Sequence, residues 1–469
     1  MACLRHVLWI MSDAENSEIV RDQWGAIGAD VLREVGDSLA AGDGKAIRAL
    51  TRDLHAADLA DLIEALEQPQ RVALIAALGR HFDVEALAEL DETTRDELIE
   101  ALPPDVVASA IKKLDTDDAL YLIEDLEEAD QQEILSKVPK EDRAALTRAL
   151  DYAEYTAGRL MQTEFVAVPA YWTVGQTIDH LRSERHLPDD FVEIYVVDPG
   201  FHLLGAVPAS RILRKPRERK IEAVMDSEQT VFHVTDGQED VAYKFEQYNL
   251  VSAAVVDESG RLVGMLMVDD IVDVIQEEAE EDILRLGGVG EEAITDTVWQ
   301  TARSRFAWLL VNLATALLAS WVISWFDATI EQMVALAVLM PIVASMGGNA
   351  GTQTMTVAVR ALATRSLGPV NAMKVVLREC AVGLINGLLF AFVAGAAAIW
   401  WFGSQGLGGV IAAAMVINLV AAALAGILIP LAFDHFDIDP AISSGVFVTT
   451  VTDVVGFFAF LGLAAVWLI

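Results

Sequence analysis

The sequence of 469 residues combines a hydrophobic content of 54% with a formal net charge of −37, two properties that are rarely found in one soluble domain. Phosphate contacts need lysine and arginine, so this charge excludes nucleic acid as a partner and favours cations. The two cysteines, Cys3 and Cys380, have neither metal-binding nor redox spacing, which excludes cysteine chemistry.

The first 29 residues are expected to be an N-terminal extension. Residues 1–11 are too short and too weakly apolar for a secretory signal. Translation can begin at Met1 or at Met11, which is followed by Ser-Asp-Ala-Glu, and the sequence leaves both starts open.

Residues 30–155 have the pattern of an acidic domain built from short amphipathic helices. Apolar residues recur at spacings of three and four in Asp58–Leu66 and in Pro104–Leu114. Prolines such as Pro139 indicate the loops between the helices. We therefore expect an α-helical, superhelical N domain.

Residues 156–274 contain an internal repeat, with copies at about 156–222 and 223–274. Ile194–Asp198 in the first copy corresponds to Ala253–Asp257 in the second, and each is followed by a turn with glycine and another apolar run. Each copy therefore predicts a helix, a strand, a turn, a strand and a helix. We expect an α/β pair whose two sheets bury their faces against one another.

An acidic segment at residues 275–303 connects this repeat to the apolar part of the chain, and we expect it to be helical. Five acids lie close together in it: Glu277, Glu278, Glu280, Glu281 and Asp282. On a helix these side chains would repel one another, and a divalent cation would relieve the repulsion. A solvated acidic helix without a bound ion is the alternative.

Residues 304–469 form the apolar part and contain five basic and seven acidic residues, a net charge of −2. Since the whole chain carries −37, the first 303 residues carry −35. A helix needs about 20 apolar residues to cross a bilayer, and several such runs in succession are improbable in a soluble protein. We predict an all-α membrane domain with five transmembrane helices, at about 306–326, 332–360, 374–402, 407–433 and 440–468.

Basic residues near the predicted spans indicate their orientation. Arg303 and Arg305 precede the first span, and four basic residues lie between the second and third spans: Arg360, Arg365, Lys374 and Arg378. We therefore expect a multi-pass protein of the cell (inner) membrane, with cytosolic N-terminal domains and the C-terminus outside. The loop at residues 434–439 should then be cytosolic, although it is acidic instead of basic.

Asp453 lies midway through the last predicted span. An ionisable group at that depth costs about 3 kcal/mol and usually marks an ion pathway, although a structural aspartate bonded to a neighbouring helix is the alternative. Thr449 lies one helical turn earlier, and Asp439 suits the N-cap of the span because Pro440 follows it. Helical spacing directs Asp439 and Asp453 to one face, about 21 Å apart along the axis. Capping alone would also explain Asp439.

The second predicted span contains Pro341–Gln353, a polar stretch rich in glycine. Gly347 and Gly351 form a small-xxx-small pair that favours close helix packing. Gly348 and Pro341 weaken the helix, and an opened backbone is tolerated in a membrane only inside protein or beside water. Three polar residues share one face of this span: Asn349, Gln353 and Thr356. We expect the segment both to pack closely and to line a pore.

The candidate ligands in the membrane domain are carboxylate, amide and hydroxyl oxygens, which favour Mg²⁺, Ca²⁺ or Mn²⁺ over zinc or copper. One Asp453 leaves a divalent ion half neutralised, so a symmetric dimer that pairs two of them is attractive. Mg²⁺ retains its waters and needs few carboxylates. The candidate residues of the ion pathway are Asp453, Asp439, Gly347, Gly348, Asn349, Gln353 and Thr449.

Together, the acidic helical domain, the CBS-type repeat, the acidic connecting segment and the five spans resemble the MgtE family of magnesium channels. The resemblance covers nearly the whole chain from about residue 30, and its most specific parts are Pro341–Gln353, Asp439–Ala441 and Thr452-Asp453. It implies a homodimer in the lipid bilayer with one pore on the two-fold axis, lined by the second and fifth spans. Asp453 of both chains would hold hydrated Mg²⁺ in this pore.

The resemblance also implies feedback by intracellular Mg²⁺. Mg²⁺ bound between the acidic domains would draw them together and fix the connecting helix, the family's plug, in a closed arrangement. The residues that match sensor positions of the family are Glu239, Asp270, Asp273, Glu278, Glu281 and Asp282. Gly237, Asn249 and Tyr121 stand where acids are expected, so the number of sensor sites stays open. CBS-type pairs often bind adenine nucleotides, and modulation by ATP stays open too, with no contacts identified.

The sequence therefore predicts a passive, Mg²⁺-selective channel for magnesium uptake, gated by cytosolic Mg²⁺. A carrier for Co²⁺ or Mn²⁺, or one coupled to H⁺ or Na⁺, is the alternative within transport. A membrane-tethered protein whose CBS-type repeat senses a nucleotide is the alternative outside it. We do not expect an enzyme, because the sequence has no recognisable nucleophile–base pair or phosphate-binding loop.

Overall fold

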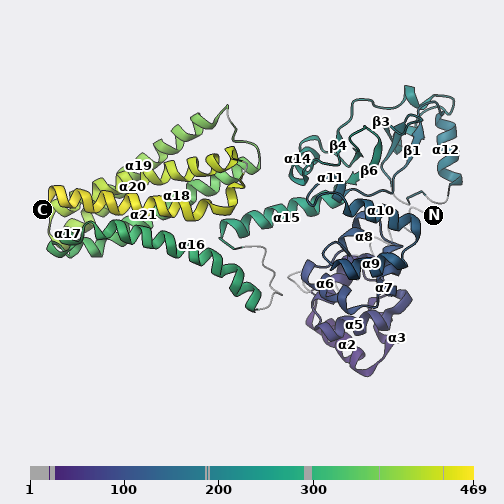
Figure 1. Cartoon of the computed structure of the whole chain (residues 1–469), viewed down its shortest axis with the longest axis horizontal. Coiled ribbons are helices and arrows are strands. Elements are labelled where there is room, and N and C mark those ends of the chain that lie inside the picture. Colours follow the sequence, from purple (N-terminus) through teal and green to yellow (C-terminus); the bar gives the residue numbers. More distant parts are fainter. Residues whose placement is uncertain are drawn as a thin grey trace. The chain divides into compact units, whose positions relative to one another are not determined.

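The computed structural model describes residues 21, 27–184, 187–188, 191–289, 298–368, 370–436 and 438–468 (Figure 1). The chain divides into two compact units, Met1–Ile275 and Gln276–Ile469. The two alternative start methionines lie outside the described residues, as does most of the expected N-terminal extension.

Short helices form the N-terminal part of the first unit, as the spacing of apolar residues predicts. Their bounds are α2 (Ala29–Ala41), α3 (Gly44–Thr51), α4 (Ala56–Glu64), α5 (Gln68–Leu78), η1 (Gly79–His81), η2 (Glu85–Leu87), α6 (Glu92–Ala101), α7 (Pro104–Ile111), α8 (Thr116–Tyr121), α9 (Glu128–Lys137) and α10 (Lys140–Leu150). Their apolar faces share one core, in which Leu62, Leu74 and Leu98 are fully buried. Side chains cap several of the helices; Asp91, for example, accepts the Thr94 N–H at the start of α6.

The repeat folds into two similar three-stranded sheets. The first contains β1 (Ala167–Pro169), β2 (Glu193–Val197) and β3 (Leu203–Pro208), and the second β4 (Val231–His233), β5 (Ser252–Val256) and β6 (Leu262–Met267). The helices of the repeat are α11 (Ala157–Leu160), α12 (Val174–Ser183), α13 (Ala209–Leu213), η3 (Ile221–Ala223) and α14 (Gln238–Tyr248). In each sheet the first pair of strands is parallel and the second pair is antiparallel.

The two sheets bury their faces against one another, which confirms the expected α/β pair. Tyr195 and Ala206 of the first sheet share a core with Ala254 and Met265 of the second. The glycine predicted in each copy is required by close packing; a Cβ on Gly205, for example, would lie 2.4 Å from the carbonyl oxygen of Asp226.

Helix α15 (Val268–Leu286) follows the second sheet and passes from the first unit into the second. It buries Ile271 and Val274 in the core of the second repeat copy. The connecting helix was expected to extend to residue 303, but α15 ends at Leu286. Gly288 has a φ of +70°, which takes the backbone out of the helical region.

The second unit contains the long apolar helices. They are α16 (Val298–Ser324), α18 (Ala335–Ala363), α19 (Ala372–Phe402), α20 (Gln405–His435) and α21 (Pro440–Trp467), with the short α17 (Asp327–Gln332) in the first loop. All five are long and apolar enough to cross a membrane. Helix α16 begins before the predicted span and includes Arg303 and Arg305.

The expected opening of the backbone near Pro341 is wrong, because α18 is a continuous helix through Pro341 and both glycines. Close packing explains these glycines instead. A Cβ on Gly351 would lie 2.5 Å from Val448 of α21, and one on Gly426 of α20 would lie 2.7 Å from the Gly351 carbonyl oxygen. Helices α18, α20 and α21 therefore lie side by side (Figure 1).

Candidate ion-binding sites

Two carboxylates from distant parts of the sequence meet in the first unit. Asp270 lies in the first turn of α15, and Asp117 lies in the first turn of α8. The Oδ2 atom of each is buried and has no hydrogen-bond partner among the described residues. Burial, followed by repulsion from Asp269 and Asp118, raises the pKa of Asp270 to about 7. Burial and the charge of Asp270 likewise raise the pKa of Asp117 well above its usual range.

Further acids surround this pair, and we call the whole set the α8–α15 cluster: Asp115, Asp117, Asp118, Asp269, Asp270 and Asp273, with Glu89 at its edge. Burial and then the charges of Asp115 and Glu89 raise the pKa of Asp118 to about 6. Burial and the charge of Asp269 raise the pKa of Asp273. In the described part of the chain, no lysine, arginine or histidine forms an ion pair with the aspartates of the cluster.

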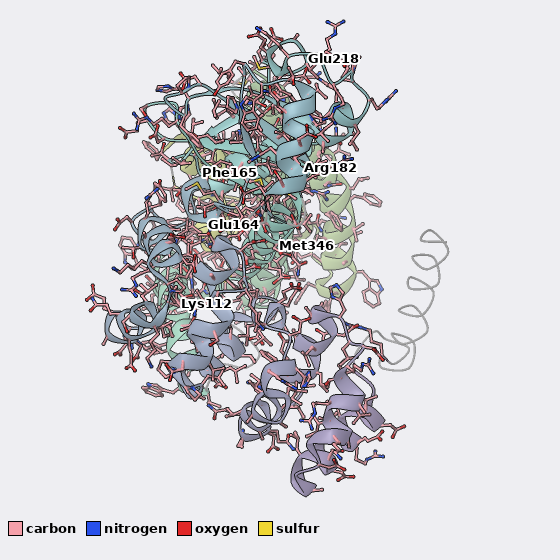
Figure 2. The ribbon with its side chains drawn as sticks, turned by 90° about the vertical axis from the view of Figure 1, so that its right-hand side faces the viewer. Lys112, Glu164, Phe165, Arg182, Glu218 and Met346 are labelled. Atoms are coloured by element: carbon pink, nitrogen blue, oxygen red, sulfur yellow. The ribbon has the colours of Figure 1, made fainter. Side chains whose placement is uncertain are left out.

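Glu164 fixes the start of α8, the helix that carries Asp117 and Asp118. Its carboxylate accepts hydrogen bonds from the Thr116 N–H (3.1 Å) and the Thr116 hydroxyl (2.8 Å). Glu164 and Lys112, both labelled in Figure 2, line a cavity of about 440 Å³ beside this turn. The wall of this cavity contains Lys112 and Lys113 as well as acids, so it is less favourable for a cation than the α8–α15 cluster.

The remaining sensor candidate of the first unit does not join the cluster. Glu239 is exposed in the first turn of α14, whereas the largest charge effects on Asp270 and Asp273 come from Asp269. The two unexpected residues nearby have backbone roles. Gly237 is the N-cap of α14, and Asn249 is its C-cap with a φ of +51°, a left-handed conformation that asparagine tolerates.

Tyr121, which stands where an acid was expected, lies against a buried cation. The Arg95 guanidinium lies 3.8 Å from the centre of its ring, and it forms ion pairs with Asp96 (3.0 Å) and Asp125 (2.7 Å). Carboxylate oxygens of Glu92, Asp96 and Asp125 lie within 4.8 Å of one another, as in a metal site. Arg95 pairs with two of these carboxylates, so its charge offsets part of the negative charge that would attract a metal ion there.

A second acidic group lies in the second unit, where the end of α15 meets the start of α21; we call it the α15–α21 cluster. It contains Glu278, Glu281, Asp282 and Asp439 together with Arg285. Arg285 Nη1 lies 2.5 Å from Asp439 Oδ2, and the same guanidinium pairs with Glu281. Burial and then the charges of Asp439 and Glu278 raise the pKa of Asp282 to about 6.

Asp439 also caps α21, as the following proline predicts. Its Oδ1 accepts the Ala441 N–H at 2.8 Å, and Pro440 occupies the first helical position. Next to this cap, Leu286 of α15 packs with Met355 of α18 and Val448 of α21. Both a charged and an apolar contact therefore attach the end of α15 to the start of α21.

The membrane candidates lie on two adjoining helices. On α21, Asp453 is half-buried and follows the fully buried Thr452. The Thr449 hydroxyl donates to backbone carbonyls of its own helix, at 2.9 Å to Gly445, which leaves its oxygen available as an acceptor. On α18, a Cβ on Gly348 would touch Thr449 at 3.9 Å. The structure therefore brings Gly348 to Thr449, whereas Gly347 lies against Asn418 of α20.

The predicted polar face of α18 is exposed in the single chain. Asn349, Gln353 and Thr356 are all exposed, and the Thr356 hydroxyl donates to the Thr352 carbonyl of its own helix. Polar side chains on a membrane helix need protein or water beside them. This face therefore needs a partner or a water-filled space that one chain does not supply.

Sequence reasoning missed several residues of these sites and of the helices around them, among them Asp117, Asp118, Arg285 and Asn418. Asp117 and Asp118 appear in the sequence only as polar positions of an amphipathic helix. Arg285 could have been found as the single base after a run of acids, four residues from Glu281. Asn418 of α20 could have been found as a lone amide in an apolar span.

Comparison with known proteins identifies the family of this chain. Family models match at residues 340–463 (MgtE, divalent cation transporter), 54–155 (MgtE intracellular N domain) and 221–277 (CBS domain). The chain is 30% identical over 437 residues to the magnesium transporter MgtE of Thermus thermophilus, covering 91% of this chain and 96% of the relative.

Two further relatives carry the same name. The Bacillus subtilis magnesium transporter MgtE is 27% identical, covering 91% of this chain and 95% of the relative. The Enterococcus faecalis protein is 31% identical, covering 70% of this chain and 72% of the relative. The helical domain, the CBS-type pair and the apolar helices are thus all parts that these proteins share, and the chain belongs to the MgtE family of magnesium transporters.

Proposed function

We propose that this protein is a Mg²⁺-selective channel that mediates magnesium uptake and is gated by intracellular Mg²⁺. The relatives named magnesium transporters support the transported ion. Asp453, with the Thr449 hydroxyl one turn away, supplies hard oxygen ligands inside an apolar helix. Such ligands suit Mg²⁺, and they suit copper and zinc less well.

The pore in this proposal lies between two copies of the chain. The exposed polar face of α18, with Asn349 and Gln353, supports a water-filled path bordered by protein. Two copies of Asp453 on a two-fold axis balance the charge of one divalent ion. Mg²⁺ dehydrates reluctantly, so it passes with water still bound and contacts few protein oxygens directly.

The observation that carries the gating proposal is that α15 contributes acids to a cluster in each unit. Asp270 and Asp273 belong to the α8–α15 cluster, and Asp282 belongs to the α15–α21 cluster. A divalent cation in either cluster relieves repulsion among carboxylates and restrains the same helix. Mg²⁺ bound inside the cell thereby holds α15 beside the start of α21, and the pore closes.

The orientation follows from the basic residues near the apolar helices. Arg303, Arg305 and the basic loop after α18 support an orientation with the two clusters in the cytosol and the C-terminus outside. Both acidic clusters then face intracellular Mg²⁺, as feedback requires. Modulation by ATP remains a prediction without assigned residues.

The test of the conducting residue is Mg²⁺ flux into liposomes that contain the full chain. Asp453→Ala is expected to lower the flux at least about tenfold, because it removes the carboxylates that balance the charge of the divalent ion, and each ~1.4 kcal/mol of lost stabilisation is tenfold. Asp327→Ala, which removes an exposed acid from α17, is the matched control and should conduct as the wild type does. Unimpaired flux through Asp453→Ala would refute the pore assignment.

The same liposomes separate a channel from a coupled carrier. Mg²⁺ flux is expected to persist when no H⁺ or Na⁺ gradient is present. Flux that requires such a gradient would favour the carrier. Ligand binding without any flux would favour a membrane-tethered sensor.

A further inference from the structure

One buried asparagine joins three of the apolar helices. Asn418 of α20 has no exposed surface, and its Nδ2 donates a hydrogen bond to the Val343 carbonyl oxygen of α18 at 2.8 Å. The same side chain lies against Gly347 of α18 and Gly456 of α21. A Cβ on Gly347 would lie 2.2 Å from Nδ2, and one on Gly456 would lie 2.7 Å from it. The amide therefore fills the space that two glycines leave between their helices.

The polar character of Asn418 is not explained by packing. The Val343 oxygen is an acceptor, so the NH₂ group must face it, and this fixes the orientation of the amide. The Oδ1 atom is then left buried, with no hydrogen-bond partner in the described part of the chain. A buried acceptor without a donor is unfavourable, and an apolar side chain would fill the same space without that cost.

The position of this junction relates Asn418 to the ion pathway. Gly456 lies three residues after Asp453 on α21, and Gly347 precedes Gly348, which faces Thr449. The amide thus lies between the two helices that carry the pathway. Its hydrogen bond fixes α20 to α18, and its contact with Gly456 sets how closely α21 approaches.

We propose that Asn418 is a positioning residue that sets the ion selectivity of the pathway, an inference that rests on the proposed function. It acts through α18 and α21 and does not contact the ion. By fixing the separation and rotation of these helices, it fixes Asp453 relative to the oxygens of Thr449 and of α18. Mg²⁺ demands near-ideal octahedral geometry, whereas Ca²⁺ accepts larger and more flexible arrangements. A small displacement of α21 therefore weakens the preference for Mg²⁺ before it abolishes conduction.

The test compares Mg²⁺ and Ca²⁺ fluxes through the full chain in liposomes. Asn418→Ala and Asn418→Leu both remove the hydrogen bond, the first leaving a void and the second filling it. Each is expected to lower the ratio of Mg²⁺ to Ca²⁺ flux about fivefold, the loss that one buried hydrogen bond produces. Met415→Leu, at a buried position of α20 that packs with Ala391 and Leu419, is the matched control.

A second variant separates the hydrogen bond from simple filling of space. In Asn418→Ala combined with Gly347→Ser, the new hydroxyl fills part of the vacated space but donates to the Val343 carbonyl of its own helix, so the bond from α20 to α18 is not restored. This double variant should keep the lowered flux ratio, and recovery of the ratio would overturn the role given to the hydrogen bond. If a position-418 variant does not fold, Gly456→Ala supplies the test, because its Cβ displaces the same amide and lowers the ratio.

The proposal would be overturned if the folded variants kept the wild-type ratio of Mg²⁺ to Ca²⁺ flux and differed only in total flux, in proportion to the amount of protein. The outcome is independent of the test of the pore. If Asp453→Ala conducts normally, the proposed function fails. If Asp453→Ala is inactive while the ratio is unaltered in the Asn418 variants, only the positioning role fails.

Discussion

At the start of α15, Asp270 lies against Asp117 and no described basic residue pairs with either, whereas near its end Arg285 pairs with both Glu281 and Asp439. The same helix thus carries two acidic clusters of different kinds. The α15–α21 cluster contains the guanidinium of Arg285, whereas no described basic side chain forms an ion pair within the α8–α15 cluster. We therefore expect a free divalent cation to change the energy of the α8–α15 cluster more, and we propose that this cluster responds to lower concentrations of Mg²⁺.

The largest expected effect comes from removing one acid of the uncompensated cluster. Asp270→Asn relieves repulsion among buried carboxylates, so the Mg²⁺-free protein should unfold about 2–4 °C higher, the shift that ~1 kcal/mol produces in a unit of this size. The same change should remove most of the stabilisation by Mg²⁺, because a ligand stabilises only the state that binds it. Thermal unfolding of the full chain with EDTA and with Mg²⁺ measures both effects.

Glu128→Gln is the matched control for this substitution, because it removes one negative charge from an exposed position of α9. It should leave both unfolding midpoints unchanged. A Mg²⁺ response that Asp270→Asn leaves intact would show that the α8–α15 cluster is not the binding site.

A smaller effect is expected when the guanidinium of Arg285 is removed from the α15–α21 cluster. Arg285→Met breaks ion pairs whose side chains are less than one-third exposed. Pairs of this kind are worth up to about 1 kcal/mol, so flux at low cytosolic Mg²⁺ should rise roughly threefold to fivefold. Closure at high Mg²⁺ should persist, because Mg²⁺ then replaces the guanidinium.

Arg285→Lys keeps the charge and should stay close to the wild type. If Arg285→Met did not close at any Mg²⁺ concentration, this would contradict the proposal that Mg²⁺ can replace the guanidinium in the α15–α21 cluster. Patch recordings with Mg²⁺ varied on the cytosolic side distinguish the two results.

The pH dependence of stability follows from the direction of the pKa shifts. The folded-state pKa of Asp270 is about 7 and that of Asp118 about 6, both raised above the ordinary value for aspartate. A raised carboxyl pKa means that the folded state binds protons more tightly. The contribution of these two groups to the free energy of unfolding is therefore greatest below about pH 4. This contribution is lost as the pH rises towards 7.

Mg²⁺ should oppose this loss, because it compensates the same carboxylates once they ionise. The unfolding midpoint in EDTA is thus expected to fall between pH 5 and pH 8 by more than the midpoint in Mg²⁺, as measured by thermal unfolding of the full chain. Asp270→Asn should reduce the difference. Equal pH dependence in the two conditions would contradict the proposed competition between protons and Mg²⁺.

The smallest effect concerns a position where an acid was expected. Asn249 has a φ of +51°, so Asn249→Ala should destabilise the first unit by about 1 kcal/mol, while Asn249→Gly should be tolerated. Neither change should alter the response of the unfolding midpoint to Mg²⁺. An altered Mg²⁺ response would give this position a role in ion binding as well.

Local patterns were sufficient to predict many parts of this fold. The spacing of apolar residues indicates the short helices and the five long ones, and the Asp439-Pro440 pair indicates a capped helix start. The repeated glycines at 205 and 264 mark equivalent strands. Each of these features depends on residues that are close together in the sequence.

The pairings that form the sites could not be predicted in this way. Asp117 and Asp270 meet only after the helical domain and the repeat have folded, and Arg285 meets Asp439 across 154 residues. The expectation of an opened helix at Pro341 failed for a similar reason. The small-xxx-small pair correctly indicated close packing, but it could not show that α20 and α21 are the helices that approach a continuous α18.

The most direct measurement of gating is Mg²⁺ current through excised patches, with the Mg²⁺ concentration varied on the cytosolic face, for the wild type and Asp270→Asn. The wild-type current should fall as cytosolic Mg²⁺ rises, and Asp270→Asn should need a Mg²⁺ concentration about tenfold higher for the same inhibition, a loss of ~1.4 kcal/mol in binding. Identical inhibition curves for the two proteins, or a current that does not respond to cytosolic Mg²⁺, would contradict the role proposed for α15.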